Sequence, residues 1–213
     1  MRLPPGWPVP SGGGLPDGVV TADQADTGIL SQVIAAAFHD LAPSRWLITD
    51  PDARREIFPG YFRIYVEHAL AQGVVHTTPD RAAAALWLPT GVHPPAPDPD
   101  YGARLEAATS PWTGRFQVFD RALERHHPAG PPHHHLAILA VRPDRQGQGI
   151  GTALLRAHHA SLDAAGMPAY LEASDLRTRA LYLICGYEDH GLPIPLAGET
   201  PMYPMWRKPR EPR

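Results

Sequence analysis

The segment VRPDRQGQGIG, residues 141–151, brings three glycines together directly after the apolar run HLAILA. Glycines at this spacing let a backbone bend tightly and approach a ligand without intervening side chains. At the N-terminus of a following helix, the successive N–H groups from Gln146 to Thr152 would point into one concavity. Hydrogen bonds and the helix dipole together make such a place favourable for a pyrophosphate. The segment therefore predicts a phosphate-binding loop.

Two other phosphate-binding motifs fit the segment less well. A P-loop needs a lysine and then Ser or Thr after its last glycine, whereas Gly151 is followed by a threonine and an alanine. A Rossmann loop would use Gly147 and Gly149, with Glu172 as the ribose ligand. It would also need a glycine where Thr152 stands, and the chain after Glu172 is too short for the remaining strands. A glycine-rich turn without any ligand stays open as an alternative.

In full, the loop follows the pattern V-x-P-x-x-Q-x-x-G-x-G, which is filled at Val141, Pro143, Gln146, Gly149 and Gly151. This pattern resembles the coenzyme A loop of the GNAT superfamily of N-acetyltransferases. The resemblance implies that the phosphate-bearing ligand is acetyl-CoA, bound as the acyl donor.

A second segment, LEASDLRTRALYLICGY at residues 171–187, resembles the next conserved block of the same superfamily. Its Leu-Tyr pair ends at Tyr182 and its Gly-Tyr pair at Tyr187. Relatives commonly carry an asparagine four residues before the first tyrosine, where this chain has Thr178, whose hydroxyl would have to substitute for the amide. Within the superfamily, the chain most resembles the puromycin N-acetyltransferases, and the resemblance is densest over residues 136–187.

The resemblance implies a mixed α/β fold of GNAT type, with a central sheet of about six to seven strands that splays between two parallel strands. It implies direct attack of a neutral primary amine on acetyl-CoA, without an acyl-enzyme. The acceptor would be a small molecule, an antibiotic or a metabolite. Two alternatives stay open: a sensor or interaction module that binds acetyl-CoA without turnover, and acetylation of proteins or peptides. The residues implied to bind acetyl-CoA are Leu139, Ala140, Val141, Arg145, Gln146, Gly147, Gln148, Gly149, Ile150, Gly151, Thr152, Thr178 and Tyr182.

Two side chains have the chemistry for the transfer that the resemblance implies. Glu172 ends a strand expected beside the splay, where its carboxylate could take the amine proton directly or through water. Tyr182 has a phenol that is protonated at neutral pH and can donate to the departing thiolate. The N–H of Val141 would hold the oxyanion. The alternatives are that Glu172 only binds a cationic amine and that Tyr182 only packs its helix and orients the cofactor.

Histidines gather in HHPAGPPHHHL, between His126 and His135. Imidazoles this close can bind zinc or nickel, but the Pro-rich loop shows no recognised ligand spacing, so we expect no metal site. An alternating strand would send His133 and His135 to one face and His134 to the other. One of them near the acceptor could relay protons. Cys185, the single cysteine, is expected to pack rather than to act as a nucleophile.

The elements that would position these residues follow from the hydrophobic periodicity. Apolar residues recur at helical spacing over about residues 25–38 and 51–73, and more weakly over 99–126. The stretch 73–89 predicts a β-hairpin around Pro79-Asp80. Two strands joined by a short helical crossover must be parallel. The remaining expected elements are strands over 19–22, 134–141, 169–172, 187–192 and 200–207, and helices over 149–165 and 178–185.

Composition limits the class of protein. The chain has 213 residues, 43% of them apolar, which predicts one globular domain over 18–213 behind a flexible Pro/Gly-rich arm, residues 1–17. Its formal net charge of −3, without a block of Lys and Arg, argues against nucleic-acid binding. No apolar run approaches the about 20 residues that span a bilayer. A single cysteine and a start unlike a signal peptide favour a cytoplasmic protein.

The acceptor site is expected among the helices before and after residue 60, the 99–126 region and the loop near 190–200. The partner would be a small-molecule amine, and the oligomeric state stays open, a homodimer included. The acidic side chains considered as attractors of a cationic amine are Glu106, Asp120 and Glu124.

Overall fold

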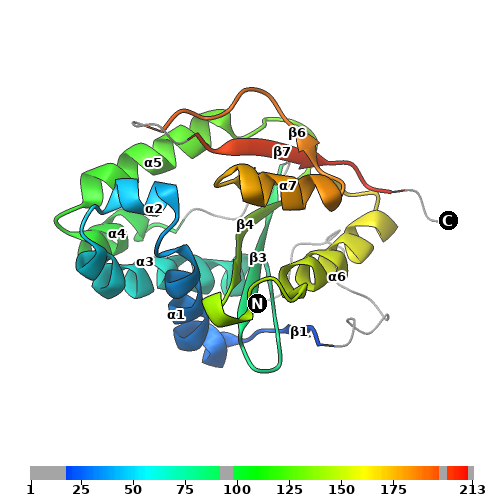
Figure 1. Ribbon diagram of the computed structural model, residues 1–213. Helices are drawn as coiled ribbons and strands as arrows, with labels where there is room; N and C mark the ends of the chain where they lie inside the picture. The colour runs from blue at the N-terminus through cyan, green and yellow to red at the C-terminus, as the bar shows by residue number, and fades with distance from the viewer. Residues whose placement is uncertain (1–17, 92–97, 197–200, 211–213) are drawn as a thin grey trace.

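The core of the protein is a seven-stranded sheet with the strand order β1-β2-β3-β4-β5-β7-β6. Figure 1 shows this sheet and the helices around it in the computed structural model. The structure describes residues 18–91, 98–196 and 201–210, so the arm expected over residues 1–17 lies outside the described residues. The strands are β1 (Val20–Thr21), β2 (Val74–Thr77), β3 (Ala83–Thr90), β4 (His133–Val141), β5 (Ala169–Ala173), β6 (Glu188–Asp189) and β7 (Tyr203–Arg207).

Helices cover both faces of this sheet (Figure 1). The α-helices are α1 (Thr27–Phe38), α2 (Ala42–Leu47), α3 (Pro51–Gln72), α4 (Tyr101–Thr109), α5 (Thr113–His126), α6 (Ile150–Ala164) and α7 (Leu176–Ile184), with short 3-10 helices η1 (Gln24–Asp26) and η2 (Pro143–Arg145). The mixed α/β class, the seven strands and the parallel pair are confirmed.

The helices differ from the sequence expectations at three places. The helix α2 was not expected, because six residues with a proline in the first turn carry too little periodicity. The 99–126 region divides into α4 and α5 around Ser110 and Pro111. The helix α7 begins at Leu176 rather than Thr178, because the Asp175 side chain accepts from the Thr178 N–H and caps the helix.

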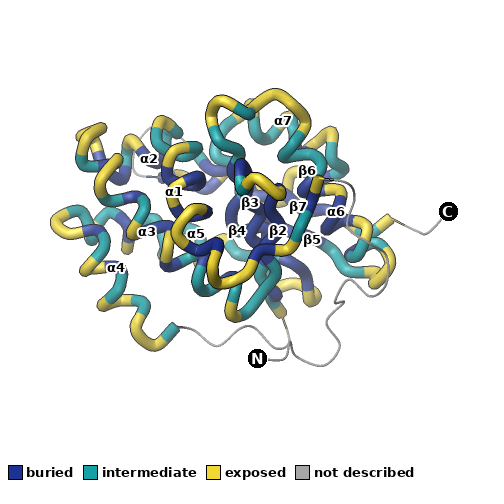
Figure 2. The backbone as a smooth tube through the Cα atoms, turned by 90° about the horizontal axis from the view of Figure 1, so that it is seen from below, coloured by how far each residue is buried: buried dark blue, intermediate teal, exposed yellow. Residues whose placement is uncertain are grey.

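The two faces of the sheet bury two separate apolar clusters, which follow from strand alternation. On β3, Ala84 and Leu86 pack against the side of α1 and α3, whereas Ala85 and Trp87 pack against the side of α6 and α7. Figure 2 shows the buried strands at the centre and the exposed segments around them. The sheet is therefore covered by helices on both faces.

Strands β4 and β5 run parallel but stay together for only two residue pairs. His134 pairs with Ala169 and His135 with Tyr170, and beyond this point the recorded partners of β4 lie on β3 and those of β5 on β7. A bulge lies at the same place, because Leu86 pairs with Ile138 while Trp87 pairs with Leu136, which leaves one extra residue on β4. The two central strands therefore diverge, as expected from the sequence.

The register of β4 directs two backbone amides into this opening. Arg142 N–H donates to the Ala82 carbonyl at 2.8 Å, so every second residue of β4 bonds β3 from there on. Leu139 and Val141 occupy the alternate positions, opposite Ala85 and Ala83. Their N–H groups consequently point away from β3, toward the side where β5 has departed.

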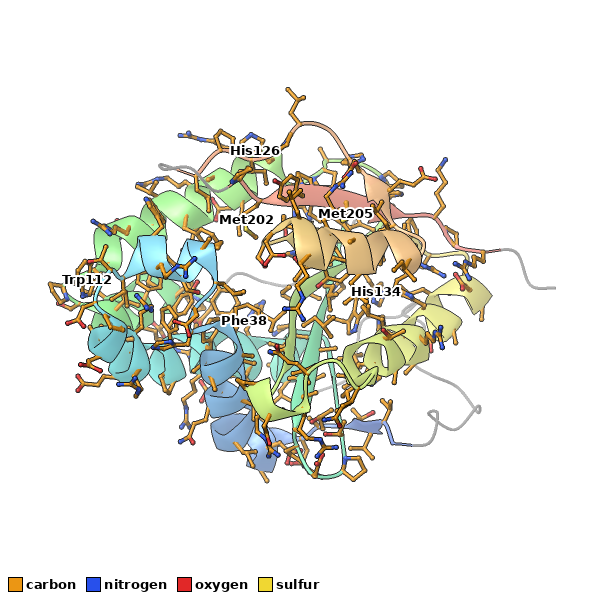
Figure 3. All side chains as sticks on the ribbon, viewed as in Figure 1. Phe38, Trp112, His126, His134, Met202 and Met205 are labelled. Atoms are coloured by element: carbon orange, nitrogen blue, oxygen red, sulfur yellow. The ribbon has the colours of Figure 1, made fainter. Side chains whose placement is uncertain are left out.

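Three histidines form a buried hydrogen-bonded row between the sheet and α6. His158 lies 3.1 Å from His76 and 2.9 Å from His134, measured between ring nitrogens, and its ring stacks on Trp87 with centroids 4.1 Å apart. Figure 3 shows His134 beside α6. Burial lowers the pKa of His76 to about 4, and burial with the charge of His133 lowers that of His134 to about 4. Burial and then the two neighbouring histidines hold the pKa of His158 well below its ordinary value.

We expect the free energy of unfolding to fall as the pH is lowered from about 7 to about 5. In the unfolded chain each of these histidines takes up a proton near its ordinary pKa of 6.5, whereas the folded ones stay neutral to about pH 4 or below. Folding thus excludes protons, and each histidine removes up to about 1.4 kcal/mol per pH unit below that value. Urea unfolding at a series of pH values measures the slope.

The variant His76→Leu removes one of the three titrating groups. Its unfolding free energy should fall with decreasing pH less steeply than that of the parent, by about one histidine's share. A parent protein whose unfolding free energy stays constant between about pH 7 and about pH 5 would contradict the expectation.

Candidate active site

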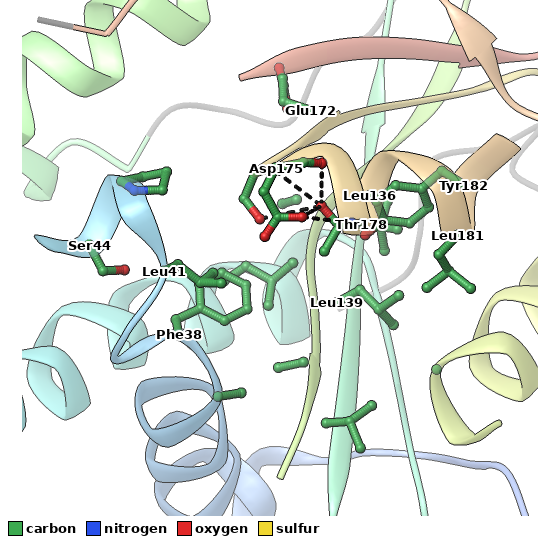
Figure 4. A pocket seen from close by; sticks show the side chains of 18 of the residues that line it. Phe38, Leu41, Ser44, Leu136, Leu139, Glu172, Asp175, Thr178, Leu181 and Tyr182 are labelled. Atoms are coloured by element: carbon green, nitrogen blue, oxygen red, sulfur yellow. Dashed lines mark hydrogen bonds between the residues drawn. The ribbon is translucent and has the colours of Figure 1, made fainter. Parts of the chain in front are cut away.

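A cavity of about 650 Å³ opens where β4 and β5 diverge. Its walls come from three regions: the glycine loop and the start of α6, the segment from β5 into α7, and the helices α1, α2, α3 and α5. Figure 4 shows Glu172, Thr178 and Tyr182 on one side of it and Phe38 and Leu41 on the other. The segments of the chain that carry the sequence motifs therefore share one cavity with the helices of the first half.

The glycine loop has the geometry of an anion site. Gly147 and Gly149 have φ of +77° and +80°, which residues other than glycine rarely adopt. The first intrahelical bond of α6 runs from Ala153 N–H to the Gly149 carbonyl at 3.0 Å. The N–H groups of Ile150, Gly151 and Thr152 precede it and have no carbonyl partner within the helix, and all three residues line the cavity. These amides and the positive end of the helix dipole face the cavity together.

Most of the residues expected to bind acetyl-CoA line this cavity, and Gln148 is the exception. Its side-chain oxygen accepts from Arg145 at 3.2 Å, and its side-chain nitrogen donates to the Asp144 carbonyl at 3.4 Å. The side chain of Gln148 thus braces the loop from outside. The expected residues that do line the cavity are Leu139, Ala140, Val141, Arg145, Gln146, Gly147, Gly149, Ile150, Gly151, Thr152, Thr178 and Tyr182.

Arg145 reaches the cavity while holding an ion pair with the turn between β2 and β3. Its guanidinium donates to Asp80 at 2.7 Å. The hydroxyl of Thr78 and then Arg145 lower the pKa of Asp80 to about 2, so this carboxylate is charged at neutral pH. The glycine loop is therefore tied to the turn between β2 and β3, which lies 65 residues earlier in the chain. Sequence spacing gave no signal for this pair.

The hydroxyl of Thr178, expected to substitute for an asparagine amide, is engaged in the cap of α7. It lies 3.1 Å from the Asp175 carbonyl oxygen and 3.0 Å from the Asp175 carboxylate, while the Asp175 N–H donates to it at 3.2 Å. Figure 4 draws these contacts. Thr178 lines the cavity, but its hydrogen bonds organise the start of the helix.

Glu172 is a buried carboxylate at the point where the strands part. Its side chain is 6% exposed, and its Oε2 accepts a hydrogen bond from His135 Nε2 at 2.9 Å. Its Oε1 is buried and has no hydrogen-bond partner among the described residues. Burial alone would raise the pKa of Glu172, but the charge and hydrogen bond of His135, with smaller effects of His127 and of the Tyr170 hydroxyl, bring the pKa below its ordinary value. The carboxylate is therefore ionised, with one oxygen available to a ligand.

Tyr182 contributes a phenol to the same cavity from α7. Its side chain packs edge-on against Tyr187, with ring centroids 5.7 Å apart, and no hydrogen bond joins its hydroxyl to another described residue. Burial, and then the neighbouring Cys185 and Asp175, raise the pKa of Tyr182 above its ordinary value. The phenol is thus protonated at neutral pH and free to donate. Cys185 is half-buried and does not line the cavity.

The strand alternation predicted for the consecutive histidines is confirmed. His134 faces α6, whereas His133 and His135 lie on the opposite face with His127. His133 Nδ1 lies 2.8 Å from the Pro131 carbonyl and its Nε2 lies 3.2 Å from His127 Nε2. The pairing of His135 with Glu172 was not expected, although both residues were singled out, because their contact depends on the register of β4 with β5.

The wall opposite the glycine loop is mainly apolar. Of the acidic candidates, Asp120 lies behind it and accepts from the Tyr101 hydroxyl at 2.7 Å, and neither Glu106 nor Glu124 lines the cavity. The contribution of α2 and the end of α1 was missed because α2 itself was missed. The side chains of this wall are Ala37, Phe38, Leu41, Pro43, Ser44, Leu47, Tyr61, Phe62, Tyr65, Phe119, Leu123 and Met202.

None of the helices in the described part of the chain combines the length and the apolar character that crossing a membrane requires.

In a comparison with known proteins, the segment that carries these residues is similar to one family. Residues 116–189 match the family described as "Acetyltransferase (GNAT) domain". This match runs from α5 to β6 and includes the glycine loop, Glu172 and Tyr182. A structure described as "histone acetyltransferase HPA2 and related acetyltransferase" from Corynebacterium glutamicum is 27% identical, with a TM-score of 0.66, over 92% of this chain and 97% of that one.

Two more distant structures share the fold. The arylalkylamine N-acetyltransferase 2 of Aedes aegypti is 10% identical, with a TM-score of 0.60, over 90% of this chain and 98% of that one. Naa20 of Chaetomium thermophilum, in complex with a bisubstrate analogue, is 16% identical, with a TM-score of 0.51, over 89% and 85% of the two chains. The matches support the superfamily, and the narrower resemblance to puromycin N-acetyltransferases stays a prediction.

We expect Gly149→Ala to weaken the binding of acetyl-CoA by about tenfold or more. An added Cβ would meet no protein atom within 4 Å, so the effect arises from the φ of +80°, which an alanine tolerates only with a strain of about 1–2 kcal/mol. Relief of that strain moves the amides that face the cavity. Isothermal titration calorimetry with acetyl-CoA measures the affinity.

The matched control is Gly166→Ala, after the other end of α6. Gly166 has a φ of +64°, equally open space around its Cβ position and no part in the cavity. It should lose similar stability and keep its affinity. If both variants bind acetyl-CoA as the parent does, the loop assignment is wrong.

Proposed function

We propose that the chain is a GNAT-type N-acetyltransferase that moves the acetyl group of acetyl-CoA to the primary amine of a small molecule with an apolar body. Amine and acetyl-CoA would be bound together, and the amine would attack the thioester directly. The observation that carries the proposal is that the glycine loop, Glu172 and Tyr182 all line one cavity.

Glu172 is suited to take the proton of the attacking amine. A general base has to be ionised and within reach of the amine, and Oε1 of Glu172 is buried without a partner while Oε2 is held by His135. His135 thereby positions the carboxylate and offsets the effect of burial. The neutral amine that results can attack the carbonyl carbon of the thioester.

The oxyanion formed by this attack needs a donor directed into the opening between the strands. The N–H groups of Leu139 and Val141 both point that way. Pairing of β4 with β5 ends at His135 and Tyr170, and Glu172 lies two residues farther along β5. Leu139 therefore lies closer to Glu172 along the diverging strands than Val141 does. The geometry favours the Leu139 amide as oxyanion donor, with Val141 toward the pantetheine side.

Collapse of the tetrahedral intermediate breaks the carbon–sulfur bond and releases the thiolate of coenzyme A. Tyr182 would donate its phenolic proton to this sulfur, the nitrogen of the new amide would release its remaining extra proton to solvent, and Tyr182 would regain a proton from solvent. Its burial keeps the phenol protonated until that step, and the described residues offer no competing acceptor for its hydroxyl. This last feature supports a donor role over a purely structural one.

The acceptor side of the cavity supports an amine with an apolar or aromatic body. Phe38, Tyr61, Phe62 and Phe119 contribute aromatic surface, and Glu172 is the carboxylate that an amine would meet beyond them. The walls come from α1, α2, α3 and α5, so the acceptor has to fit between helices. A small molecule fills such a space without the extended chain that a protein substrate would bring.

We expect a mass-spectrometric screen with acetyl-CoA to yield products one acetyl group heavier from aromatic primary amines. The panel should contain phenylalkylamines, puromycin, aminoglycosides, polyamines, amino acids and peptides. The variant Tyr182→Phe should lower kcat by about 100-fold or more while acetyl-CoA affinity stays within about threefold, because the hydroxyl acts after binding. Leu183→Ala, at the exposed neighbour of Tyr182 on α7, serves as the matched control with unchanged kcat.

The screen separates the proposed activity from its alternatives. Products from peptides alone would favour protein acetylation. Tight acetyl-CoA binding without any product would favour a sensor or interaction module. An unchanged kcat in Tyr182→Phe would exclude the phenol as the proton donor.

We also expect His135→Phe to move the acidic limb of the pH profile of kcat/KM upward by roughly 1–3 pH units. Burial raises the pKa of Glu172, whereas His135, and to a smaller extent His127 and Tyr170, lower it. Without His135 the carboxylate stays protonated to higher pH and the base is lost there. Rates measured with one amine at a series of pH values report the shift, since the amine's own titration is common to both profiles.

The matched control is His135→Gln, whose amide can still donate to Glu172. The acidic limb of its pH profile should lie between that of the parent and that of His135→Phe. A profile of His135→Phe that superimposes on that of the parent after scaling would show that Glu172 does not control the acidic limb.

A further inference from the structure

The histidine-rich loop and the site share a cluster that acetyl transfer does not use in full. One ring nitrogen each of His127 and His135 and one carboxylate oxygen of Glu172 lie within 4.8 Å of one another. The three residues come from separate elements, the end of α5, β4 and β5. Their rings and carboxylate are partly or fully withdrawn from solvent, and His135 and Glu172 face the cavity.

Two imidazoles and one carboxylate are a donor set that zinc and related transition metals bind. Bonds of about 2 Å place the ligand atoms on one ion about 3–4 Å apart. The atoms within 4.8 Å therefore need shifts of about 1 Å or less to meet on one ion. Oε1 of Glu172 is buried without a hydrogen-bond partner among the described residues, so the carboxylate retains an oxygen that could bind a metal ion.

His127 is held in the form that ligates metals. The Pro131 carbonyl can only accept, so His133 carries its proton on Nδ1 and accepts at Nε2. His127 then donates from Nε2 to His133 and keeps an unprotonated Nδ1. Burial, and then the charge of His135, lower the pKa of His127 to about 4, so its ring is neutral at physiological pH. Metal-bound histidines are usually oriented by a second hydrogen bond of this kind.

We propose that His127, His135 and Glu172 form a binding site for a divalent transition-metal ion such as Zn²⁺, with an open coordination position toward the cavity. The site joins a histidine of the loop before β4 to the carboxylate at the divergence of β4 and β5. The sequence pattern did not predict it, because the ligands are spaced by strand register and not by a recognised motif.

A consequence rests on the proposed function. If Glu172 accepts the amine proton, a metal ion on Glu172 and the acceptor amine exclude each other. Zinc would then inhibit acetyl transfer competitively with the amine and leave acetyl-CoA binding intact.

The test is titration of the full, tag-free chain with ZnCl₂ by isothermal calorimetry, and with CoCl₂ by visible absorption. One equivalent should bind, and Co²⁺ should give the absorption of a site with nitrogen and oxygen ligands at low coordination number. The variant His127→Gln should weaken this binding by roughly 100-fold or more, since loss of an outer hydrogen bond alone costs 10–100-fold.

His126→Gln is the matched control. His126 is exposed and neighbours His127 on the chain, and its one recorded hydrogen bond within the described ranges is to the Ala122 carbonyl at 2.7 Å, so the variant should bind Zn²⁺ as the parent does. Equal affinity in His127→Gln and the parent, or no stoichiometric binding up to millimolar Zn²⁺, would overturn the proposal.

Activity measurements keep the two proposals apart. Inhibition by Zn²⁺ that is competitive with the amine and disappears in His127→Gln supports the site and the role of Glu172 together. Stoichiometric binding that depends on His127 but leaves acetylation unaffected supports the metal site and contradicts the role of Glu172.

Discussion

The divergence of β4 from β5 is the constraint on which the site depends. Two parallel strands that stayed paired would bury their amides against each other and leave no room for a ligand. Pairing stops after His135 and Tyr170, and a bulge in β4 falls within two residues of that point. The amides of Leu139 and Val141 are thereby left directed into a cavity, and Glu172 stands at its apex. The glycine loop follows directly after the end of β4, so the same strand forms one side of the opening and leads into the anion site.

The same opening sets the electrostatics of the site. A carboxylate as buried as Glu172 would normally hold its proton, and a histidine on the neighbouring strand reverses this. Across the sheet, burial lowers the pKa of His76, His134 and His158, and this row stays neutral at physiological pH. Two adjacent residues of β4 thus have different roles: His135 stabilises the charge of Glu172, whereas His134 stays uncharged in the core. Their difference arises from the face of the sheet on which each lies.

Local patterns in the sequence were sufficient for the parts of the site that lie within one segment. The glycine spacing identified a loop with two residues at positive φ, and the motif around Tyr182 placed a phenol in the cavity. Parts that depend on register or on distant contacts were not accessible in this way. The pair of His135 with Glu172 requires the alignment of two strands, and that of Arg145 with Asp80 joins the glycine loop to a hairpin far earlier in the chain. The helix α2 was not predicted because six residues are too few to show the helical periodicity of apolar side chains.

The three consecutive histidines of β4 have a consequence for how this segment can change in evolution. In most strands a slip by one residue exchanges every inward side chain for an outward one of different chemistry. Here a slip of β4 by one position would still leave a histidine beside Glu172 or beside His158, because the run supplies the same ring to both faces. The apolar residues that follow, Leu136 on the α6 face and Ile138 and Ala140 on the opposite face, therefore have to define the register. An insertion or deletion in the preceding Pro-rich loop could shift which of the three histidines takes each position. The loop can therefore vary in length while a histidine is kept at the start of β4.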